Sequence, residues 1–149
     1  MEPVSCQVQG VYFAASELGV APVVLLETPD HLYIPIFIGL YEAISIDNAL
    51  NGPRSARPMT HDLFAETLKQ LGAKIRDVRI DTLEDGVYYA TISLDSNSGE
   101  IFIDCRPSDG IALAVRLQSP ILVDDMLLKD SAVPSAMLPE LRDIAAGFG

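Results

Sequence analysis

Residues 36–42 read Ile36-Phe37-Ile38-Gly39-Leu40-Tyr41-Glu42, and residues 101–109 read Ile101-Phe102-Ile103-Asp104-Cys105-Arg106-Pro107-Ser108-Asp109. Both begin with the apolar run Ile-Phe-Ile, which is typical of a β-strand, and lead through a short connection to an acidic residue and a helix. Each of these strands also follows a hairpin. The likeness predicts a duplicated strand–strand–strand–helix unit, with a chance repeat of three letters as the alternative. Two such units would face each other across a pseudo-dyad, with both connections near one site.

The strands before residue 36 support this first unit. Residues 4–9 alternate apolar and polar side chains, and the pattern continues over residues 11–13 after Gly10, which suggests a bulge. Residues 22–28 are apolar on both faces and predict a central strand. Pro35 interrupts the third strand, residues 32–38, as prolines do at a sheet edge or a bulge. We expect the three strands to form an antiparallel meander.

Two helices are expected between the halves. The first ends near Leu50, before the stop signal Asn51-Gly52. Thr60 is a favourable N-cap for the second, which ends at Gly72.

The second half repeats the strand pattern. Residues 74–81, 87–94 and 101–105 read as strands, and Asp85-Gly86 is a strong hairpin signal. A helix is expected over residues 110–117 and a short strand over residues 120–123.

These elements define an α+β fold: internally duplicated antiparallel meander–helix units packed as one domain. A chain of 149 residues fits one domain. We place that domain at residues 1–125 and a short helical C-terminal tail at residues 126–149. Within the tail, residues 126–128 and 138–145 have the pattern of two short amphipathic helices.

Composition narrows the classes of protein. The formal net charge of −11 opposes approach to phosphate backbones, so any nucleic-acid binding needs a local arginine cluster or metal ions. The mean hydropathy of +0.27 is high for a small domain and predicts a homo-oligomer, with a dimer favoured. Apolar runs are of strand length, so no membrane span is expected. Cys6 and Cys105 predict reduced core thiols, and we expect a cytoplasmic protein without a signal peptide.

The most unusual local stretch is Arg106-Pro107-Ser108-Asp109. It lies between a strand and a helix N-terminus, where free backbone N–H groups attract anions. Arg106 could bind a phosphate or a carboxylate through two N–H groups at once. The alternative is structural: Ser108 or Asp109 caps the helix, while Arg106 pairs with Asp104 or another nearby acid.

A second candidate is the stretch from Arg57 to Asp62, which contains Thr60 and His61. A histidine in the first helical turn could act as a general acid or base near neutral pH. The alternative is a solvated His61 beside an Asp62 that interacts favourably with the helix dipole.

Taken together, these stretches resemble the bifunctional nuclease family. The matching segments are residues 32–39 with Glu42 and Ala43, residues 57–63, residues 71–73 and residues 103–109, and the likeness covers about residues 4–123. Cys105 and Gly110 stand where the family usually has alanine. The resemblance implies an α+β fold with a duplicated strand-rich unit, and nuclease activity on RNA and DNA as described for some plant members.

The first hypothesis is therefore a nuclease that hydrolyses RNA or DNA phosphodiester bonds. A divalent metal such as Mg²⁺ would activate water, held by some of Glu42, Asp62, Asp104 and Asp109. The catalytic candidates are His61, Asp62, Asp104, Arg106 and Asp109, and the substrate-binding candidates are Arg57, Arg106 and Ser108. The second hypothesis is a non-catalytic oligomeric module that uses the same cluster to bind a small anionic ligand or a protein partner.

Overall fold

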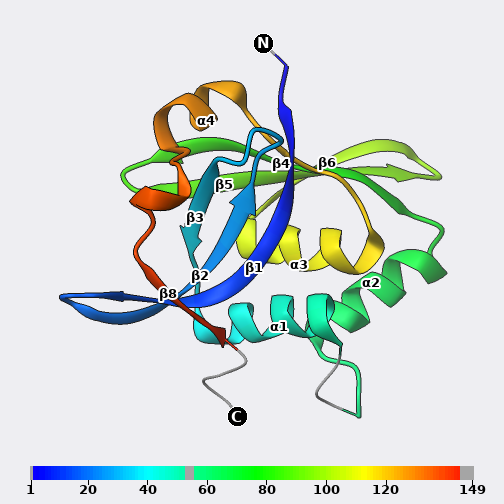
Figure 1. The fold of residues 1–149 in the computed structure, drawn as a ribbon. Helices are drawn as coiled ribbons and strands as arrows, with labels where there is room; N and C mark the ends of the chain where they lie inside the picture. Colours follow the sequence, from blue (N-terminus) through cyan, green and yellow to red (C-terminus); the bar gives the residue numbers. More distant parts are fainter. Residues whose placement is uncertain (1, 53–55, 145–149) are drawn as a thin grey trace.

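The computed structural model describes residues 2–52 and 56–144. Its first half is the expected meander of β1 (Val4–Ser16), β2 (Gly19–Glu27) and β3 (Tyr33–Phe37), paired as antiparallel neighbours (Figure 1). A register shift between Val8 and Gly10 confirms the predicted bulge. The strand β2 lies between its two partners, and β3 lies at the edge of the sheet, where Pro35 is tolerated.

The second half repeats this arrangement. It contains β4 (Lys74–Glu84), β5 (Val87–Ser96) and β6 (Gly99–Cys105), again antiparallel neighbours. The short β7 (Ile121–Val123) joins the halves, antiparallel to β1 and parallel to β4. The strand order is β3-β2-β1-β7-β4-β5-β6, so each half contributes three strands in mirrored order on either side of β7. The α+β fold expected from the sequence is confirmed.

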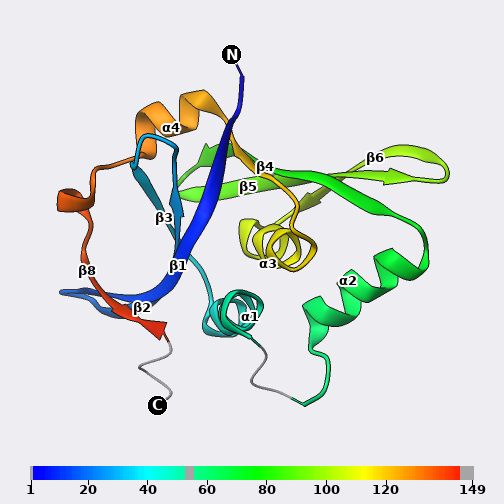
Figure 2. The same cartoon turned by 45° about the vertical axis from the view of Figure 1, so that its right-hand side comes forward.

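Three helices pack on the inner side of the bent sheet. They are α1 (Leu40–Asn51), α2 (Thr60–Gln70) and α3 (Pro107–Leu117), and α1 and α3 each follow the third strand of their half. Figure 2 shows α1 and α3 nearly end-on within the curve of the sheet, with α4 (Asp125–Ser131) on the opposite face of β4 and β5. The fully buried centre of the core lies between α1, α3 and the strands, at Leu26, Ile34, Ile46, Val78, Ile80, Ile111 and Leu113.

The C-terminal tail differs from the expected pair of helices. Its first part is the predicted helix, α4, followed by a 3-10 turn, η1 (Ser135–Met137). Its second part is a strand, β8 (Glu140–Asp143), which pairs with residues 12–15 of β1. The helix predicted for residues 138–145 is therefore wrong over its described part, and residue 145 lies outside the described residues. The reason is that β7 pairs only with residues 4–6 of β1, which leaves the rest of that strand edge open for β8.

The predicted N-cap of α2 is also wrong, and the alternative in which Ser108 or Asp109 caps α3 does not hold. Met59 occupies the N-cap of α2 and Thr60 is its first helical residue, because the Asp62 carboxylate reaches back to accept a hydrogen bond from the Met59 N–H at 2.9 Å. Arg106 occupies the N-cap of α3, which begins three residues earlier than expected because Pro107 suits the first helical position. Ser108 and Asp109 therefore lie inside the first turn.

Two further expectations concern the chain as a whole. Among the described residues, no helix combines the length and the apolar character that crossing a membrane requires. Cys6 is buried, Cys105 is half-buried, and both are free thiols, as predicted.

Candidate functional site

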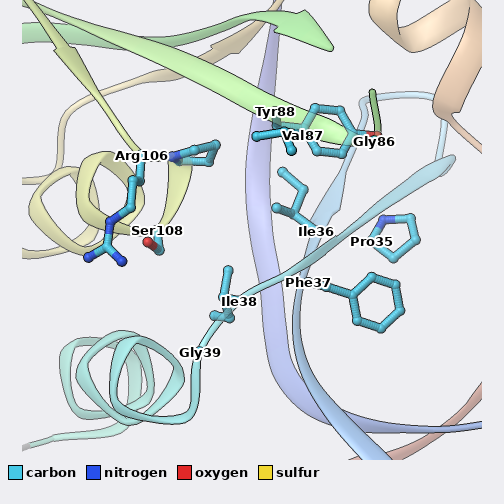
Figure 3. Close-up of a pocket in the computed structure, with 11 residues that line it drawn as sticks. Pro35, Ile36, Phe37, Ile38, Gly39, Gly86, Val87, Tyr88, Arg106 and Ser108 are labelled. Carbon is cyan, nitrogen blue, oxygen red and sulfur yellow. The ribbon is translucent and has the colours of Figure 1, made fainter. Parts of the chain in front are cut away.

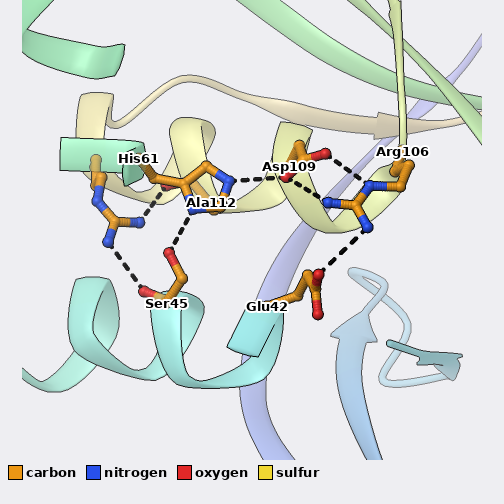
Figure 4. Close-up of polar contacts among 7 residues, drawn as sticks. Glu42, Ser45, His61, Arg106, Asp109 and Ala112 are labelled. Atoms are coloured by element: carbon orange, nitrogen blue, oxygen red, sulfur yellow. Dashed lines mark hydrogen bonds and ion pairs between the residues drawn. The ribbon is translucent and has the colours of Figure 1, made fainter. Parts of the chain in front are cut away.

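The starts of α1 and α3 meet the start of α2 at one polar cluster (Figure 4). Glu42 lies in the first turn of α1, His61 in the first turn of α2, and Asp109 in the first turn of α3. Arg106, the N-cap of α3, reaches from the strand–helix connection of the second half to Glu42, which follows that of the first half. The duplication thus brings both connections to one site, as its symmetry predicts.

Arg106 joins two carboxylates. Its Nε donates to Asp109 Oδ2 at 2.8 Å and its second terminal nitrogen donates to Asp109 Oδ1 at 3.1 Å, which is a bidentate pair. The other terminal nitrogen donates to Glu42 Oε1 at 3.3 Å. The Arg106 side chain is still 63% exposed, and a guanidinium has more N–H donors than these three contacts use. An incoming anion can therefore reach it.

His61 is held on both ring nitrogens. Its Nε2 lies 2.8 Å from Asp109 Oδ1, and its Nδ1 lies 2.6 Å from Ser45 Oγ. The His61 side chain is only 14% exposed, so its orientation is fixed by these two contacts and by packing between the helices. A solvated histidine, the structural alternative, does not describe this ring.

The electrostatics of Asp109 favour one proton arrangement. Burial opposes the charged form of Asp109, but the hydrogen bonds from Arg106 and His61 outweigh it and hold the pKa below its ordinary value. The same pairing raises the pKa of Arg106. Because an ionised Asp109 is an acceptor only, His61 Nε2 donates to it, and in the matching tautomer Nδ1 accepts a hydrogen bond from the Ser45 hydroxyl.

A second arginine fixes the helices around this cluster. The Arg116 side chain is 7% exposed and its Nε donates to Asp62 Oδ1 at 2.7 Å. Its terminal nitrogens donate to the carbonyl oxygens of Ala112, at 3.0 Å, and Ser45, at 3.1 Å. The Arg116 hydrogen bond lowers the pKa of Asp62, and the Met59 backbone N–H lowers it further. Arg116 thus holds α1, α2 and α3 together. It contacts Asp62, which follows His61 in the sequence, and Ser45, whose side chain contacts the His61 ring.

The cluster opens into a pocket of about 240 Å³. Among the cluster residues that line it, Arg106 is the most exposed, while Ser45 and His61 are largely buried. The remaining lining residues are Tyr41, Met59 and Thr60. The pocket therefore presents one exposed guanidinium beside a histidine whose tautomer is set by a carboxylate and a hydroxyl.

The structure brings together some of the predicted site residues and separates others. Glu42, His61, Arg106 and Asp109 line one pocket, and Ser108 lines the neighbouring one. The other three lie outside both pockets: Asp62 faces Arg116, Asp104 is exposed on β6, and Arg57 is exposed before α2.

The four acids proposed as metal ligands do not converge. Glu42 and Asp109 are both paired with Arg106, while Asp62 is paired with Arg116. Within residues 2–52 and 56–144 there is no group of three or more His, Cys, Asp or Glu side chains placed to hold a metal ion. Of the four acids, some of which were expected to hold a metal, Glu42 and Asp109 line one pocket, whereas Asp62 and Asp104 lie outside it, and no step of the reaction proposed below depends on a metal.

Sequence reasoning missed Ser45 and Arg116. Ser45 lies three residues after Glu42, on the same side of an expected helix, which was a usable signal. Arg116 lies at the far end of α3 from Asp109, and only the packing of three helices gives it a role.

The fold and the site define a class: a duplicated α+β domain in which the starts of three helices hold an arginine–carboxylate–histidine cluster. A family profile described as the bifunctional nuclease domain matches residues 23–136. The chain belongs to this bifunctional nuclease domain family, as its sequence motifs predicted. The match extends past residue 125, where we expected the domain to end.

Individual relatives agree with this assignment. The chain is 37% identical over 123 residues to uncharacterized protein Rv1829 of Mycobacterium tuberculosis, covering 82% of this chain and 71% of the relative. It is 29% identical over 110 residues to bifunctional nuclease 2 of Arabidopsis thaliana, covering 72% of this chain and 33% of the relative. It is 31% identical over 107 residues to bifunctional nuclease 1 of Oryza sativa subsp. japonica, covering 70% of this chain and 32% of the relative. The chain thus spans about a third of these plant relatives.

Proposed function

We propose that this protein is a nuclease that hydrolyses phosphodiester bonds of RNA or DNA at the pocket around Arg106 and His61. The observation that carries the proposal is the Ser45–His61–Asp109 chain of hydrogen bonds, 2.6 Å and 2.8 Å long, beside an exposed arginine. A base oriented by a third group, next to a cation that can bind phosphate, is the arrangement that hydrolytic sites use. Membership of a family whose plant relatives are named nucleases supports it.

Each residue has a distinct task in this mechanism. Arg106 binds a phosphate oxygen and neutralises the charge that grows on it during attack. Asp109 keeps the imidazole oriented, with the proton on Nε2. The Ser45 hydroxyl passes its proton to His61 Nδ1 and takes one from a water, which attacks phosphorus as the bond to the leaving oxygen breaks. The imidazolium then returns the proton toward the leaving oxygen.

A divalent cation remains an expectation of this proposal. Mg²⁺ is commonly bound by one or two carboxylates together with substrate phosphates. Glu42 is the carboxylate in the best position to exchange Arg106 for a cation. Its side chain is 22% exposed, and its hydrogen bond is the longest of the three that Arg106 makes. Metal dependence is tested by running the cleavage assay with Mg²⁺ and with a chelator.

A specific observation also supports the second hypothesis, a non-catalytic anion-binding module. Arg106 already has two carboxylate partners, and the net charge of the chain is −11. This negative charge repels a long nucleic acid more strongly than a small anion, so a small anion could bind Arg106 where a polyanion would not. The discriminating experiment measures cleavage of single-stranded RNA and DNA oligonucleotides by the wild type and by Asp109→Ala from parallel preparations. Cleavage that Asp109→Ala abolishes supports the nuclease; phosphate binding with no cleavage in either metal condition supports the module.

Assembly into a homodimer is part of the proposal. β6 is an edge strand that exposes Ile101, Phe102 and Ile103, with Phe102 62% exposed. An open edge strand with apolar side chains readily pairs with a second copy. Sedimentation that shows a clean monomer at micromolar concentration contradicts this. The two free thiols support the expected cytoplasmic location.

A further inference from the structure

A second pocket, of about 440 Å³, lies on the other side of Arg106 (Figure 3). It is bounded by β3 and the residues after it, by the β4–β5 turn, and by the first turn of α3. Figure 3 shows Arg106 and Ser108 on one side, Ile36 and Ile38 across from them, and Val87 and Tyr88 above. Its volume falls within the range of small-molecule sites.

Arg106 lines both this pocket and the pocket that contains His61. A phosphate bound to its exposed guanidinium therefore has His61 on one side and the second pocket on the other. Whatever is attached to that phosphate on the second side must lie in this pocket or leave the protein surface.

Ser108 supplies an independent sign that the second pocket takes a ligand. Its side chain lines the pocket and the residue is only 4% exposed, yet its hydroxyl makes no hydrogen bond to any residue in the described ranges. The hydroxyl oxygen is not closed off from solvent, so it is open to the pocket, where a ligand oxygen can form a hydrogen bond with it. It also lies in the first turn of the 11-residue helix α3, where the N–H groups favour negative charge.

The opposite side of the pocket is apolar and includes one aromatic ring. Ile36 is buried, Ile38 and Tyr88 are half-buried, and Val87 is exposed. Aromatic and aliphatic surface next to a phosphate-binding group suits a nucleoside, whose base stacks on such surface while its phosphate meets the cation.

From these observations we propose that the second pocket binds the nucleoside attached to the scissile phosphate, with its base against Tyr88 and Ile38 and its sugar or phosphate oxygen on Ser108. This assignment rests on the proposed function, because it takes the phosphate on Arg106 to be the one that is cleaved. It identifies the substrate as a single strand, since a base paired in a duplex is not free to enter a pocket.

Calorimetric titrations with AMP, ribose phosphate and inorganic phosphate test the proposal without requiring cleavage. The wild type should bind AMP at least about fivefold more tightly than ribose phosphate, because only AMP carries a base to stack. Tyr88→Leu should abolish that preference and leave the affinity for inorganic phosphate unchanged. Ser108→Ala should weaken AMP and ribose phosphate together.

Tyr89 provides a matched control. It is adjacent to Tyr88 on β5, so its side chain points to the other face of the sheet, and it is 41% exposed. Tyr89→Leu should keep the preference for AMP. Since Tyr88 also packs against the core, a second measurement on the wild type avoids relying on the variant: AMP, but not ribose phosphate, should shift the methyl resonances of Ile36 and Ile38.

Equal affinities for AMP and ribose phosphate, equal effects of the two tyrosine variants, or unshifted Ile36 and Ile38 methyls would each overturn the nucleoside pocket. The outcome is separable from that of the nuclease. A preference for AMP without oligonucleotide cleavage keeps the pocket and rejects the nuclease. Cleavage without a preference for AMP keeps the nuclease and rejects the pocket.

Discussion

Arg116 should be the residue whose loss loosens the site most, although it touches no substrate. In Arg116→Met the apolar stem remains and three hydrogen bonds disappear, those to Asp62, Ala112 and Ser45. Each lost contact to a backbone carbonyl costs about 1 kcal/mol. The contact to Asp62 adds about 1 kcal/mol rather than the full value of a buried pair, because Asp62 is 40% exposed and can be hydrated. The free energy of unfolding should therefore fall by about 3 kcal/mol.

Urea unfolding followed by circular dichroism measures this change. The matched control is Arg76→Met, because Arg76 is 46% exposed and pairs with Asp95 and Glu100 on the strand surface. That variant should lose less than about 1 kcal/mol. If Arg116→Met loses no more stability than Arg76→Met does, Arg116 does not clamp the three helices and the account of how His61 is positioned fails.

Three further predictions concern pH, packing and thiol reactivity. Asp62 and Asp109 have folded pKa values below the ordinary 3.8, so the stability that their charged forms contribute is present above pH 3.8 and should be lost as the pH falls below that value. Urea unfolding of the wild type should show this loss of stability, and the loss should be smaller in Asp62→Asn. In Gly110→Ala the new Cβ would lie 2.6 Å from Cγ1 of Val78, a fully buried residue, so the free energy of unfolding should fall by about 1–2 kcal/mol. A gain in stability would show that the higher helix propensity of alanine outweighs this close contact. Burial raises the pKa of Cys6 and Cys105 to about 11, so alkylation by iodoacetamide at mildly alkaline pH should be much slower in the native protein than in urea, and equal rates would contradict it.

Much of the fold could be predicted from local patterns. Asp85 and Gly86 both adopt positive φ in the β4–β5 turn, the conformation for which Asp-Gly is favoured, so that hairpin was visible in two residues. The strand β8 was not predictable in the same way. Residues 140–143 form a strand because β1 offers them an open edge, which is a property of a distant segment.

The residues of the site likewise divide into those that local sequence patterns indicate and those that depend on the packing of distant segments. Arg106 and Asp109 lie three residues apart and His61 lies in the first turn of a helix, so their residue types and positions could be recognised from the sequence. The contact between His61 and Ser45 joins two helices across 16 residues of sequence, and its existence depends on how α1 and α2 pack. The four carboxylates all have suitable chemistry for metal binding and differ in their surroundings: Glu42 and Asp109 pair with Arg106, Asp62 pairs with Arg116, and Asp104 is exposed on β6.

The most direct test of the central claim is the rate at which His61→Asn cleaves a single-stranded oligonucleotide, compared with the wild type. Asparagine can keep a polar contact to Asp109 or Ser45, but it cannot accept the proton that His61 Nδ1 takes from Ser45. The account predicts that the cleavage rate falls by about a hundredfold or more while the melting temperature stays within a few degrees. Cleavage at the wild-type rate by the folded variant would contradict it, because the activity would then arise elsewhere.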